Sequence, residues 1–301
     1  MEEPCYTRHM LKRLLLPTLL SFSFSALAIV GNDRTVTDKG HDNVCRLLIE
    51  DKSGFGICSG SLIKPNQILT AAHCFDHMSK DTKITVGCGY RGIDQKKVSL
   101  QKSKAGNLTY KEGVRFLESA KGTSYKLHPN WVEGKEEFDQ AILNLDHPLK
   151  IKTMAIDETP ANIPMSCFSG GYGINKDIRM GILNIGRIHS EQLRENAFEF
   201  VESKFVSVFT DVNEDDYYLA DPQMILKHAL RDTMDYAVMV YGDSGGPVFC
   251  KYSESTSGEY FQVGLNRVLP YSIKQRGKTN VFDITFTSGF SFVDLDFALS
   301  F

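Results

Sequence analysis

One serine is surrounded by residues that suit it for acyl-transfer chemistry. Residues 242–247 read Gly-Asp-Ser-Gly-Gly-Pro, so glycines bracket Ser244. A serine hydroxyl is a weak nucleophile at neutral pH, and its attack on a carbonyl needs a base for the proton and N–H donors for the oxyanion. Glycine allows the tight turn that brings the amides of Gly242 and Ser244 together. Gly, Asp and Ser are also common in ordinary turns, so the motif alone leaves both interpretations open.

A histidine suited to act as the base lies in residues 70–74, which read Thr-Ala-Ala-His-Cys. An alternative for His73 is a zinc site with Cys74 and His77, because imidazole and thiolate are common zinc ligands. The sequence has no second ligand cluster at finger-like spacing, which argues against zinc. His73 is therefore interpreted as the base, and no metal is expected.

A carboxylate that suits this histidine is Asp139, at the start of the apolar run Phe-Asp-Gln-Ala-Ile-Leu at 138–143. The run predicts a buried strand. A buried carboxylate without a partner is costly, and a histidine partner explains its presence. The remaining histidines lack such a context and are interpreted as surface or packing residues: His9, His41, His128, His147, His189 and His228.

Four motifs together resemble the chymotrypsin/trypsin-like serine peptidases. They are Cys-Ser-Gly-Ser-Leu-Ile at 58–63, Leu-Thr-Ala-Ala-His-Cys at 69–74, the run at 138–143 and the hexapeptide at 242–247. The order His, Asp, Ser is the order that this family uses. The resemblance extends from Ile29 to about Phe282, which is nearly the whole chain after its first segment.

The resemblance implies a role for each reactive residue. His73 is expected to be the general base and acid, Asp139 to orient and stabilise the imidazolium, and Ser244 to be the nucleophile. The N–H groups of Gly242 and Ser244 are expected to form the oxyanion hole.

The resemblance also implies which residues form the specificity pocket. Val238 corresponds to the base of the pocket, Tyr241 to its mouth, and Asn280 to a wall position where glycine is common. Without an acid at the base, a bound Lys or Arg side chain would be unpaired, so we expect a preference for apolar or small side chains before the scissile bond. The alternative is an acid from another loop, such as Asp232, Asp235 or Asp283.

The first residues predict export. A basic Met-Leu-Lys-Arg segment from Met10 precedes an apolar stretch of 15 residues from Leu14 to Ala28, which ends in Ala-Leu-Ala. This is the pattern of a secretory signal peptide at 1–28, with translation starting at Met10. The stretch is shorter than the ~20 residues that cross a bilayer. We expect a secreted protein, extracellular or periplasmic, with no stable membrane anchor after cleavage.

Cleavage after Ala28 would expose Ile-Val-Gly, which resembles the first residues of active peptidases in this family. There the freed amine of the first residue, here Ile29, pairs with the carboxylate beside the nucleophile, here Asp243. A buried carboxylate is stabilised by such a cation. The alternative is that Ile-Val-Gly is only the end of the apolar region.

Cysteine content predicts an oxidising compartment. Without Cys5 in the leader, six cysteines remain, and they allow 15 pairings among which the sequence alone cannot choose. The resemblance implies Cys58–Cys74 and Cys167–Cys250. Cys45 and Cys88 are then left to each other, on segments expected to be neighbouring strands of the first barrel.

The elements that must position these residues are predicted to be short strands. Short runs of residues that favour β-strands are separated by Gly, Asn, Asp and Ser. These runs are at 46–49, 83–86, 141–145, 198–209, 260–265 and 281–286. The fold class is all-β, with two six-stranded antiparallel β-barrels packed together and the active site between them. The expected units are a first barrel at 29–150 carrying His73 and Asp139, a linker at 151–165, and a second barrel at 166–301 carrying Ser244. Segments 100–127, 211–233 and 251–259 are expected to be enlarged surface loops, with a short helix at 222–231.

Composition fits a single globular enzyme. The 301 residues are 42% hydrophobic and 24% charged, with a net charge of -3, and nothing indicates nucleic-acid binding. Protein or peptide substrates and protein inhibitors are the expected partners, and the chemistry needs no cofactor. The alternative is a secreted non-enzymatic or weakly active homologue with a binding role, although such proteins usually lack a triad member.

Overall fold

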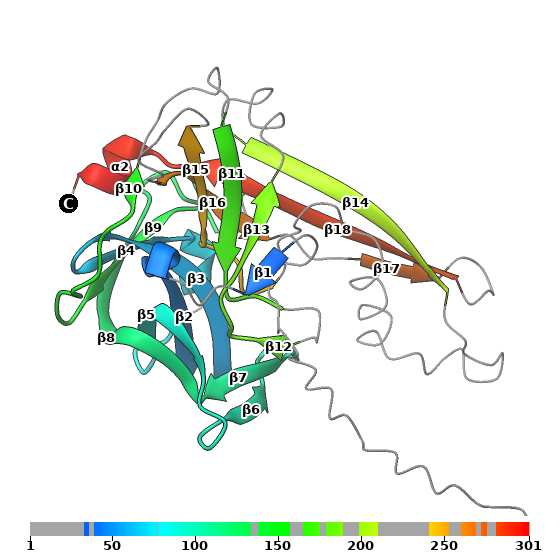
Figure 1. The fold of residues 1–301 in the computed structure, drawn as a ribbon, viewed down its shortest axis with the longest axis horizontal. Coiled ribbons are helices and arrows are strands. Elements are labelled where there is room, and N and C mark those ends of the chain that lie inside the picture. Colours follow the sequence, from blue (N-terminus) through cyan, green and yellow to red (C-terminus); the bar gives the residue numbers. More distant parts are fainter. Residues whose placement is uncertain are drawn as a thin grey trace, which may run out of the picture.

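The protein is built almost entirely from β-strands (Figure 1). The computed structural model describes residues 33–35, 39–76, 78–133, 138–156, 165–174, 179–188, 199–209, 241–252, 260–268, 272–275 and 281–300. Within these residues the helical elements are two 3-10 turns, η1 (Lys39–His41) and η2 (Ala72–Phe75), and the short helix α2 (Leu295–Leu299). The all-β class predicted from the sequence is confirmed.

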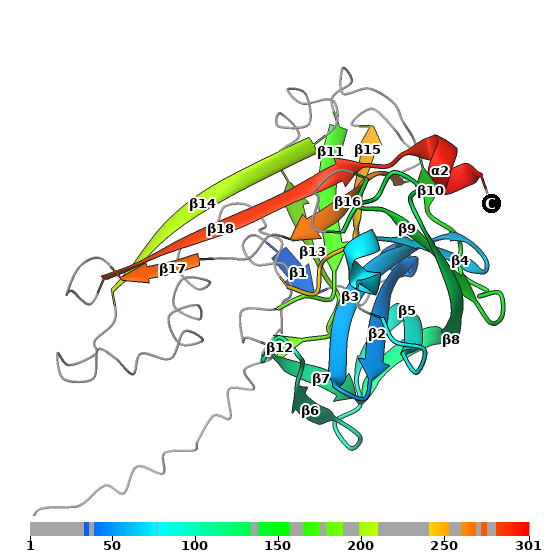
Figure 2. The same ribbon diagram turned by 180° about the vertical axis from the view of Figure 1, so that it is seen from behind.

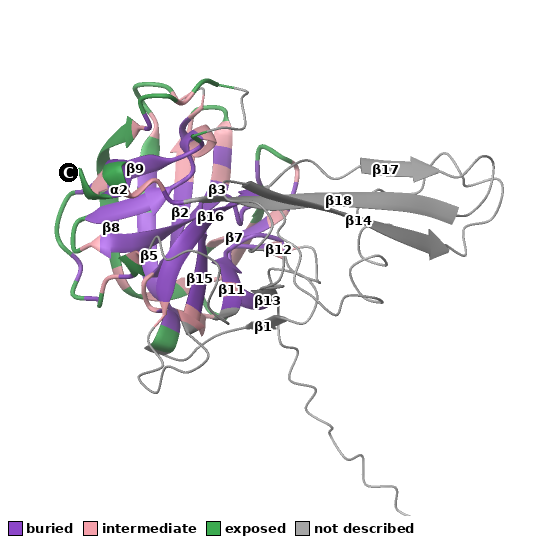
Figure 3. Cartoon of the chain, turned by 90° about the horizontal axis from the view of Figure 1, so that it is seen from above, coloured by how far each residue is buried: buried purple, intermediate pink, exposed green. Residues whose placement is uncertain are grey.

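Six antiparallel strands from the first half of the chain close into a barrel in the order β2-β3-β4-β9-β8-β5. Their bounds are β2 (Val44–Asp51), β3 (Gly54–Lys64), β4 (Gln67–Thr70), β5 (Lys83–Ile93), β8 (Val114–Leu127) and β9 (Ala141–Leu145). Figure 3 shows buried residues along these strands. The interior contains aliphatic side chains with no exposed surface, among them Leu47, Leu62, Ile68, Val86 and Leu143. Burial of each such side chain stabilises the folded state by about 1.5–3 kcal/mol relative to leaving it exposed to water.

The expectation that residues 100–127 form an enlarged surface loop is wrong for most of that segment. β8 closes the barrel between β5 and β9, and β7 (Leu108–Glu112) pairs with β6 (Ser99–Lys102). The sequence of β8 hides the strand because its exposed positions include Arg115, Lys121 and Lys126, which leaves no continuous apolar run. The other two expected loops lie outside the described residues for most of their length. These undescribed residues are 211–233, which include the expected helix, and 253–259.

Eight strands from the second half, together with β1, form a nine-stranded sheet in the order β1-β13-β11-β15-β16-β18-β14, with β10 paired to β16 and β17 to β18. Their bounds are β1 (Asp33–Thr35), β10 (Ala155–Ile156), β11 (Met165–Gly171), β13 (Asn184–Ile188), β14 (Glu199–Phe209), β15 (Pro247–Tyr252), β16 (Phe261–Val268), β17 (Ser272–Gln275) and β18 (Val281–Phe292). β14 and β18 pair as a long ribbon that extends away from the barrel (Figures 1 and 2). β1, from the start of the described chain, joins the sheet beside β13.

The two halves are joined by apolar and polar contacts. Val44 packs in one buried cluster with Tyr172 and Phe249, and the Tyr172 hydroxyl donates to the Val44 carbonyl at 3.2 Å. Ser61 on β3 donates to Gln262 on β16 at 2.6 Å, with both side chains fully buried. β12 (Arg179–Met180), from the second half, also pairs with β7 of the first. These contacts fix the position of each half against the other.

The C-terminal helix α2 is anchored against the barrel beside a buried histidine. Asp294 caps the helix by accepting from the Phe297 amide at 3.0 Å, and it also lies 3.1 Å from His128 Nε2. The Asp294 amide donates to the Gln140 side chain at 3.0 Å. Phe297 packs with barrel residues in a buried cluster. Hydrogen bonding by the helix amide lowers the pKa of Asp294, with a smaller contribution from His128.

Three disulfides cross-link the fold. Cys45–Cys88 joins neighbouring strands β2 and β5, Cys58–Cys74 joins β3 to η2, and Cys167–Cys250 joins β11 to β15. In the part of the chain that the structure describes, no helix is long and apolar enough to cross a membrane.

Candidate active site

His73 is fixed at the end of a barrel strand by a covalent cross-link. β4 ends at Thr70, and His73 follows in the turn η2. Its neighbour Cys74 is bonded to Cys58 on β3, which ties the turn to the barrel wall. The His73 side chain remains 31% exposed. The ring can therefore contact both a buried partner and a ligand.

Asp139 is the buried partner of this histidine. It lies two residues before β9 and is only 3% exposed. The preceding residue, Phe138, has a φ of 58°, a conformation that bulky residues rarely adopt. The Gln140 amide donates a hydrogen bond to the Phe138 carbonyl at 2.7 Å, which forms a tight turn around Asp139. Such local strain is often found at functional sites. The turn presents the Asp139 carboxylate to η2.

Two contacts from the Asp139 carboxylate define the orientation of the imidazole. Oδ1 accepts from the His73 backbone amide at 2.8 Å, and Oδ2 lies 2.6 Å from His73 Nδ1. A carboxylate at this position favours the proton on Nδ1. The other ring nitrogen, Nε2, is then available as an acceptor, which is the form that a general base requires.

Ser244 lies in the loop before β15, between two glycines with positive φ. Gly242 has φ 95° and Gly245 has φ 78°, conformations that residues with a Cβ rarely adopt. A Cβ on Gly245 would also lie 2.5 Å from the Ala71 amide, so the loop packs directly against the segment that leads to His73. This close packing brings the nucleophile candidate from the second half of the chain next to the histidine from the first.

The peptide that carries the Gly242 amide is held by its carbonyl. The Tyr241 carbonyl accepts from the Ile174 amide at 3.0 Å. In a trans peptide the N–H points opposite to the C=O, so this bond sets the direction of the Gly242 N–H. Among the described residues, none accepts a hydrogen bond from that N–H.

The peptide that carries the Ser244 amide is held in the same manner. Its carbonyl, Asp243 O, accepts from the Gly246 amide at 2.9 Å. The Ser244 N–H likewise has no acceptor within the described part of the chain. Two fixed amides with free protons, next to a serine, are the arrangement that stabilises a carbonyl oxyanion.

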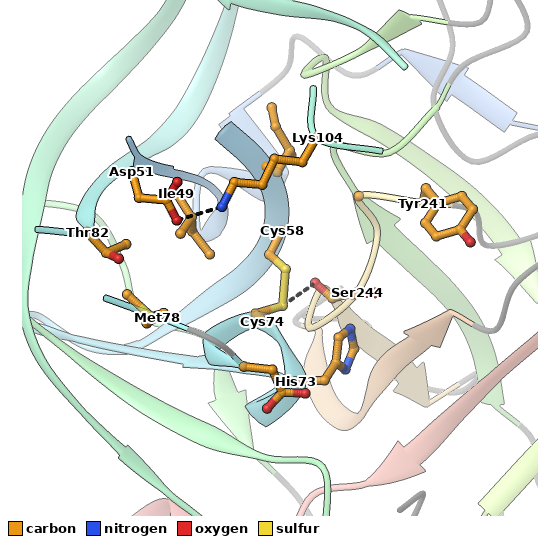
Figure 4. A pocket seen from close by; sticks show the side chains of 14 residues that line it. Ile49, Asp51, Cys58, His73, Cys74, Met78, Thr82, Lys104, Tyr241 and Ser244 are labelled. Carbon is orange, nitrogen blue, oxygen red and sulfur yellow. Dashed lines mark hydrogen bonds and ion pairs between the residues drawn. A yellow bond between two sulfur atoms is a disulfide. The ribbon is translucent and has the colours of Figure 1, made fainter. Parts of the chain in front are cut away.

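A cleft of about 400 Å³ opens beside these groups. Figure 4 shows the His73 ring and Ser244 at one end of the cleft and the Asp51–Lys104 ion pair, at 2.6 Å, at the other. Its walls include Ile49, Ile57, Met78 and the Cys58–Cys74 disulfide. The Cys74 sulfur lies 3.9 Å from the Ser244 carbonyl, and because a disulfide sulfur has no proton to donate, this is a packing contact.

Asp243, next to the nucleophile candidate, points into the protein. It is fully buried, and its Oδ1 accepts from the Gly173 amide at 2.7 Å. A Cβ on Gly173 would lie 2.6 Å from that carboxylate, and a Cβ on Gly171 would overlap it. The two glycines therefore provide the space that the carboxylate occupies.

The structure brings together several residues singled out in the sequence and leaves others undescribed. His73, Gly242, Ser244 and Tyr241 line the cleft, and Asp139 lies behind His73. The Tyr241 ring also packs against a buried cluster. Three other expected site residues, Ile29, Val238 and Asn280, lie outside the described residues.

Some residues that shape the site were not singled out in the sequence. Ser59 lies inside the motif at 58–63, but nothing in the motif connects its hydroxyl to the loop of Ser244. Lys104 lies in a loop, where lysine is common. Gly171 and Gly173 belong to a glycine-rich segment that the sequence does not connect to Asp243. In the described ranges, no group of three or more His, Cys, Asp or Glu side chains is arranged to hold a metal ion.

A closed antiparallel barrel in an almost all-β chain, with a His–Asp pair beside a glycine-flanked serine, defines the class of chymotrypsin-fold hydrolases. Residues 30–286 match the family model described as Trypsin. The chain therefore belongs to the trypsin family of serine peptidases, a family that acts on protein and peptide substrates.

Proposed function

We propose that this protein is an exported serine endopeptidase that uses His73, Asp139 and Ser244 as its catalytic triad. The observation that carries the proposal is the double contact from Asp139 to the backbone and ring of His73, at the end of the cleft that Ser244 also lines. Membership of the trypsin family supports peptide hydrolysis at the level of the family.

In the proposed reaction, Ser244 Oγ attacks the carbonyl carbon of the scissile bond and His73 Nε2 takes its proton. The carbonyl oxygen becomes an oxyanion, which accepts from the amides of Gly242 and Ser244. The imidazolium, stabilised by Asp139, then gives its proton to the leaving amine, and an acyl-enzyme ester remains. Water attacks this ester while Nε2 takes the water proton, and His73 then gives that proton to Ser244 Oγ as the acyl–oxygen bond breaks, which releases the acid and restores the serine.

We propose that the active form begins at Ile29 and that its amine pairs with Asp243. The strand register supports this, since Thr35 lies opposite Asn184, and Asn184 lies opposite Gly171, which adjoins the Asp243 carboxylate. Neighbouring strands are about 4.8 Å apart, so Thr35 is roughly 10 Å from Gly171. Six residues of extended chain reach up to about 20 Å, so the Ile29 amine is within reach of the carboxylate.

Export follows from the signal peptide at 1–28, and the three disulfides support an oxidising destination, extracellular or periplasmic. In the proposed domain division, the barrel at 29–150 supplies His73 and Asp139, and the unit at 166–301, after a linker at 151–165, supplies Ser244. Protein inhibitors that fill the cleft are further expected partners.

We further propose a preference for apolar or small side chains before the scissile bond, because Val238 provides no acid at the base of the specificity pocket. The test is hydrolysis of a chromogenic peptide panel by protein that begins at Ile29, with Ser244→Ala as the control. We expect cleavage after apolar or small residues that the control lacks. Fastest cleavage after Arg or Lys would contradict the proposed preference. Absence of any cleavage by the correctly processed protein would instead favour a binding role.

A further inference from the structure

Ser59, in β3, connects the barrel to the loop that carries the nucleophile. The side chain is fully buried. Its hydroxyl donates to the Gly242 carbonyl at 2.7 Å and accepts from the Tyr172 amide at 2.9 Å. Its own backbone amide donates to the Ser244 carbonyl at 2.9 Å. One residue of the first half therefore holds two carbonyls of the loop from the second half.

The direction of the Ser59 hydroxyl proton is determined by its surroundings. A hydroxyl has one proton and two lone pairs, and the Tyr172 amide uses a lone pair. The proton is therefore directed to the Gly242 carbonyl. Each group in this three-member network is buried, and loss of the hydroxyl would leave a buried acceptor and a buried donor without a partner.

The bond from Ser59 matters because Gly242 is a residue at which the loop can rotate easily. Glycine has no Cβ to restrict its torsion angles, and Gly242 is in a positive-φ conformation. The preceding peptide is held by Ile174, and the bond from Ser59 holds the following one. With both peptides fixed, the Gly242 N–H keeps one direction. If either were released, one of the two oxyanion donors could turn away from the cleft.

We propose that Ser59 is a positioning residue for the oxyanion hole, which acts through the Gly242 peptide on the transition state and not on substrate binding. The proposal rests on the proposed function of Ser244 as nucleophile. It predicts a loss confined to kcat when the hydroxyl is removed, because the oxyanion exists only after attack has begun.

The test compares Ser59→Ala with a matched control, Ser61→Ala. Ser61 lies two residues further along β3 and is equally buried, but its hydroxyl donates to Gln262 and not to the nucleophile loop. The assay is hydrolysis of a p-nitrophenyl ester of a short apolar acid by protein that begins at Ile29. Because removal of an oxyanion donor typically costs about 10²–10³ in kcat, we expect a misdirected donor in Ser59→Ala to lower kcat about 10–100-fold.

Three further readouts distinguish positioning from general damage. In Ser59→Ala, KM should stay within about 2–3-fold of wild type, because substrate contacts are retained. The pH midpoint of kcat/KM should not change, because the hydroxyl does not contact His73. An alkylboronic acid, whose tetrahedral adduct resembles the oxyanion intermediate, should bind more weakly by a factor similar to the loss in kcat. Ser61→Ala should lower thermal stability but leave kcat within about twofold.

A kcat within twofold of wild type for Ser59→Ala, a loss confined to KM, or an equal loss in Ser61→Ala would overturn the proposal. If Ser59→Ala does not fold, Ser59→Gly provides the second variant, because the vacated space admits a water that can bridge the two buried groups. A kcat loss of at least about threefold at unchanged KM is then expected, and no loss overturns the proposal. Failure of the wild-type protein to hydrolyse the ester would instead refute the proposed function.

Discussion

Asp139→Asn should abolish nearly all activity by reversing the protonation of the His73 ring. The His73 backbone amide needs the acceptor that it now finds in Oδ1 at 2.8 Å, so the amide oxygen of the introduced asparagine would take that position. The new NH2 group would then occupy the position of Oδ2, 2.6 Å from Nδ1. A donor there forces the ring proton onto Nε2, which can no longer accept from Ser244. The expected loss in kcat is about 10⁴-fold, or about 5 kcal/mol in the barrier.

The chain offers a matched control for this variant in a second His–Asp pair. Asp294 lies 3.1 Å from the buried His128, away from the cleft, so Asp294→Asn should leave ester and peptide hydrolysis within about twofold of wild type. Steady-state kinetics on both variants, with circular dichroism to check folding, provide the comparison. More than one-tenth of wild-type kcat in folded Asp139→Asn would refute the assignment of Asp139 as the residue that orients His73.

Three other expectations concern a disulfide and a glycine near the site and the stability of the fold. Replacing Cys58 and Cys74 together by Ala should lower the free energy of unfolding by about 3 kcal/mol, as estimated for a loop of about 15 residues, measured by urea denaturation. Gly173→Ala should abolish the proposed peptidase activity, because the new Cβ would lie 2.6 Å from the carboxylate of Asp243, the residue that precedes Ser244. The pKa of Asp294 lies below its ordinary value of 3.8, because the first helix amides donate to the carboxylate. The stability that the ionised Asp294 adds to the fold is therefore present above about pH 4. It is lost as the pH falls through the lower pKa of the folded state. Thermal melts of wild type and Asp294→Asn should therefore differ at pH 6 and converge in acid.

Each of these expectations has a contrary result. An unchanged urea midpoint without the Cys58–Cys74 bond would show that the cross-link adds nothing to the barrel. Full activity of Gly173→Ala would show that the carboxylate can move without disturbing the oxyanion amides. A difference between the melting curves of wild type and Asp294→Asn that persists or grows in acid would reverse the sign of the charge effect.

The sequence predicts best those features that depend on local composition. The apolar runs that became β2, β5, β9, β14, β16 and β18 were found because turn residues separate them. β8 was missed because only one of its faces is buried, and its other face carries charged residues. The resemblance to a family, and not the spacing of the cysteines, selected two disulfide pairs among the 15 possibilities.

The candidate catalytic residues could be proposed from their types, but the residues that hold them could not. His73 and Ser244 lie in distinctive motifs. The role of Ser59 depends on a hydrogen bond to a residue 183 positions away, and such a contact cannot be derived from one sequence. The space for the Asp243 carboxylate cannot be derived either. It forms where Gly171 and Gly173, at and just after the end of β11, pack against a loop far along the chain.

If His73 activates Ser244 as a nucleophile, the serine hydroxyl should react with an electrophilic phosphorus reagent. The protein that begins at Ile29 is treated with diisopropyl fluorophosphate, and its peptides are analysed by mass spectrometry. We expect one phosphoryl adduct per molecule on Ser244, and a reaction slowed at least about 10³-fold in His73→Ala. An unmodified Ser244 in folded, correctly processed protein, or equally fast labelling without the imidazole, would contradict this activation.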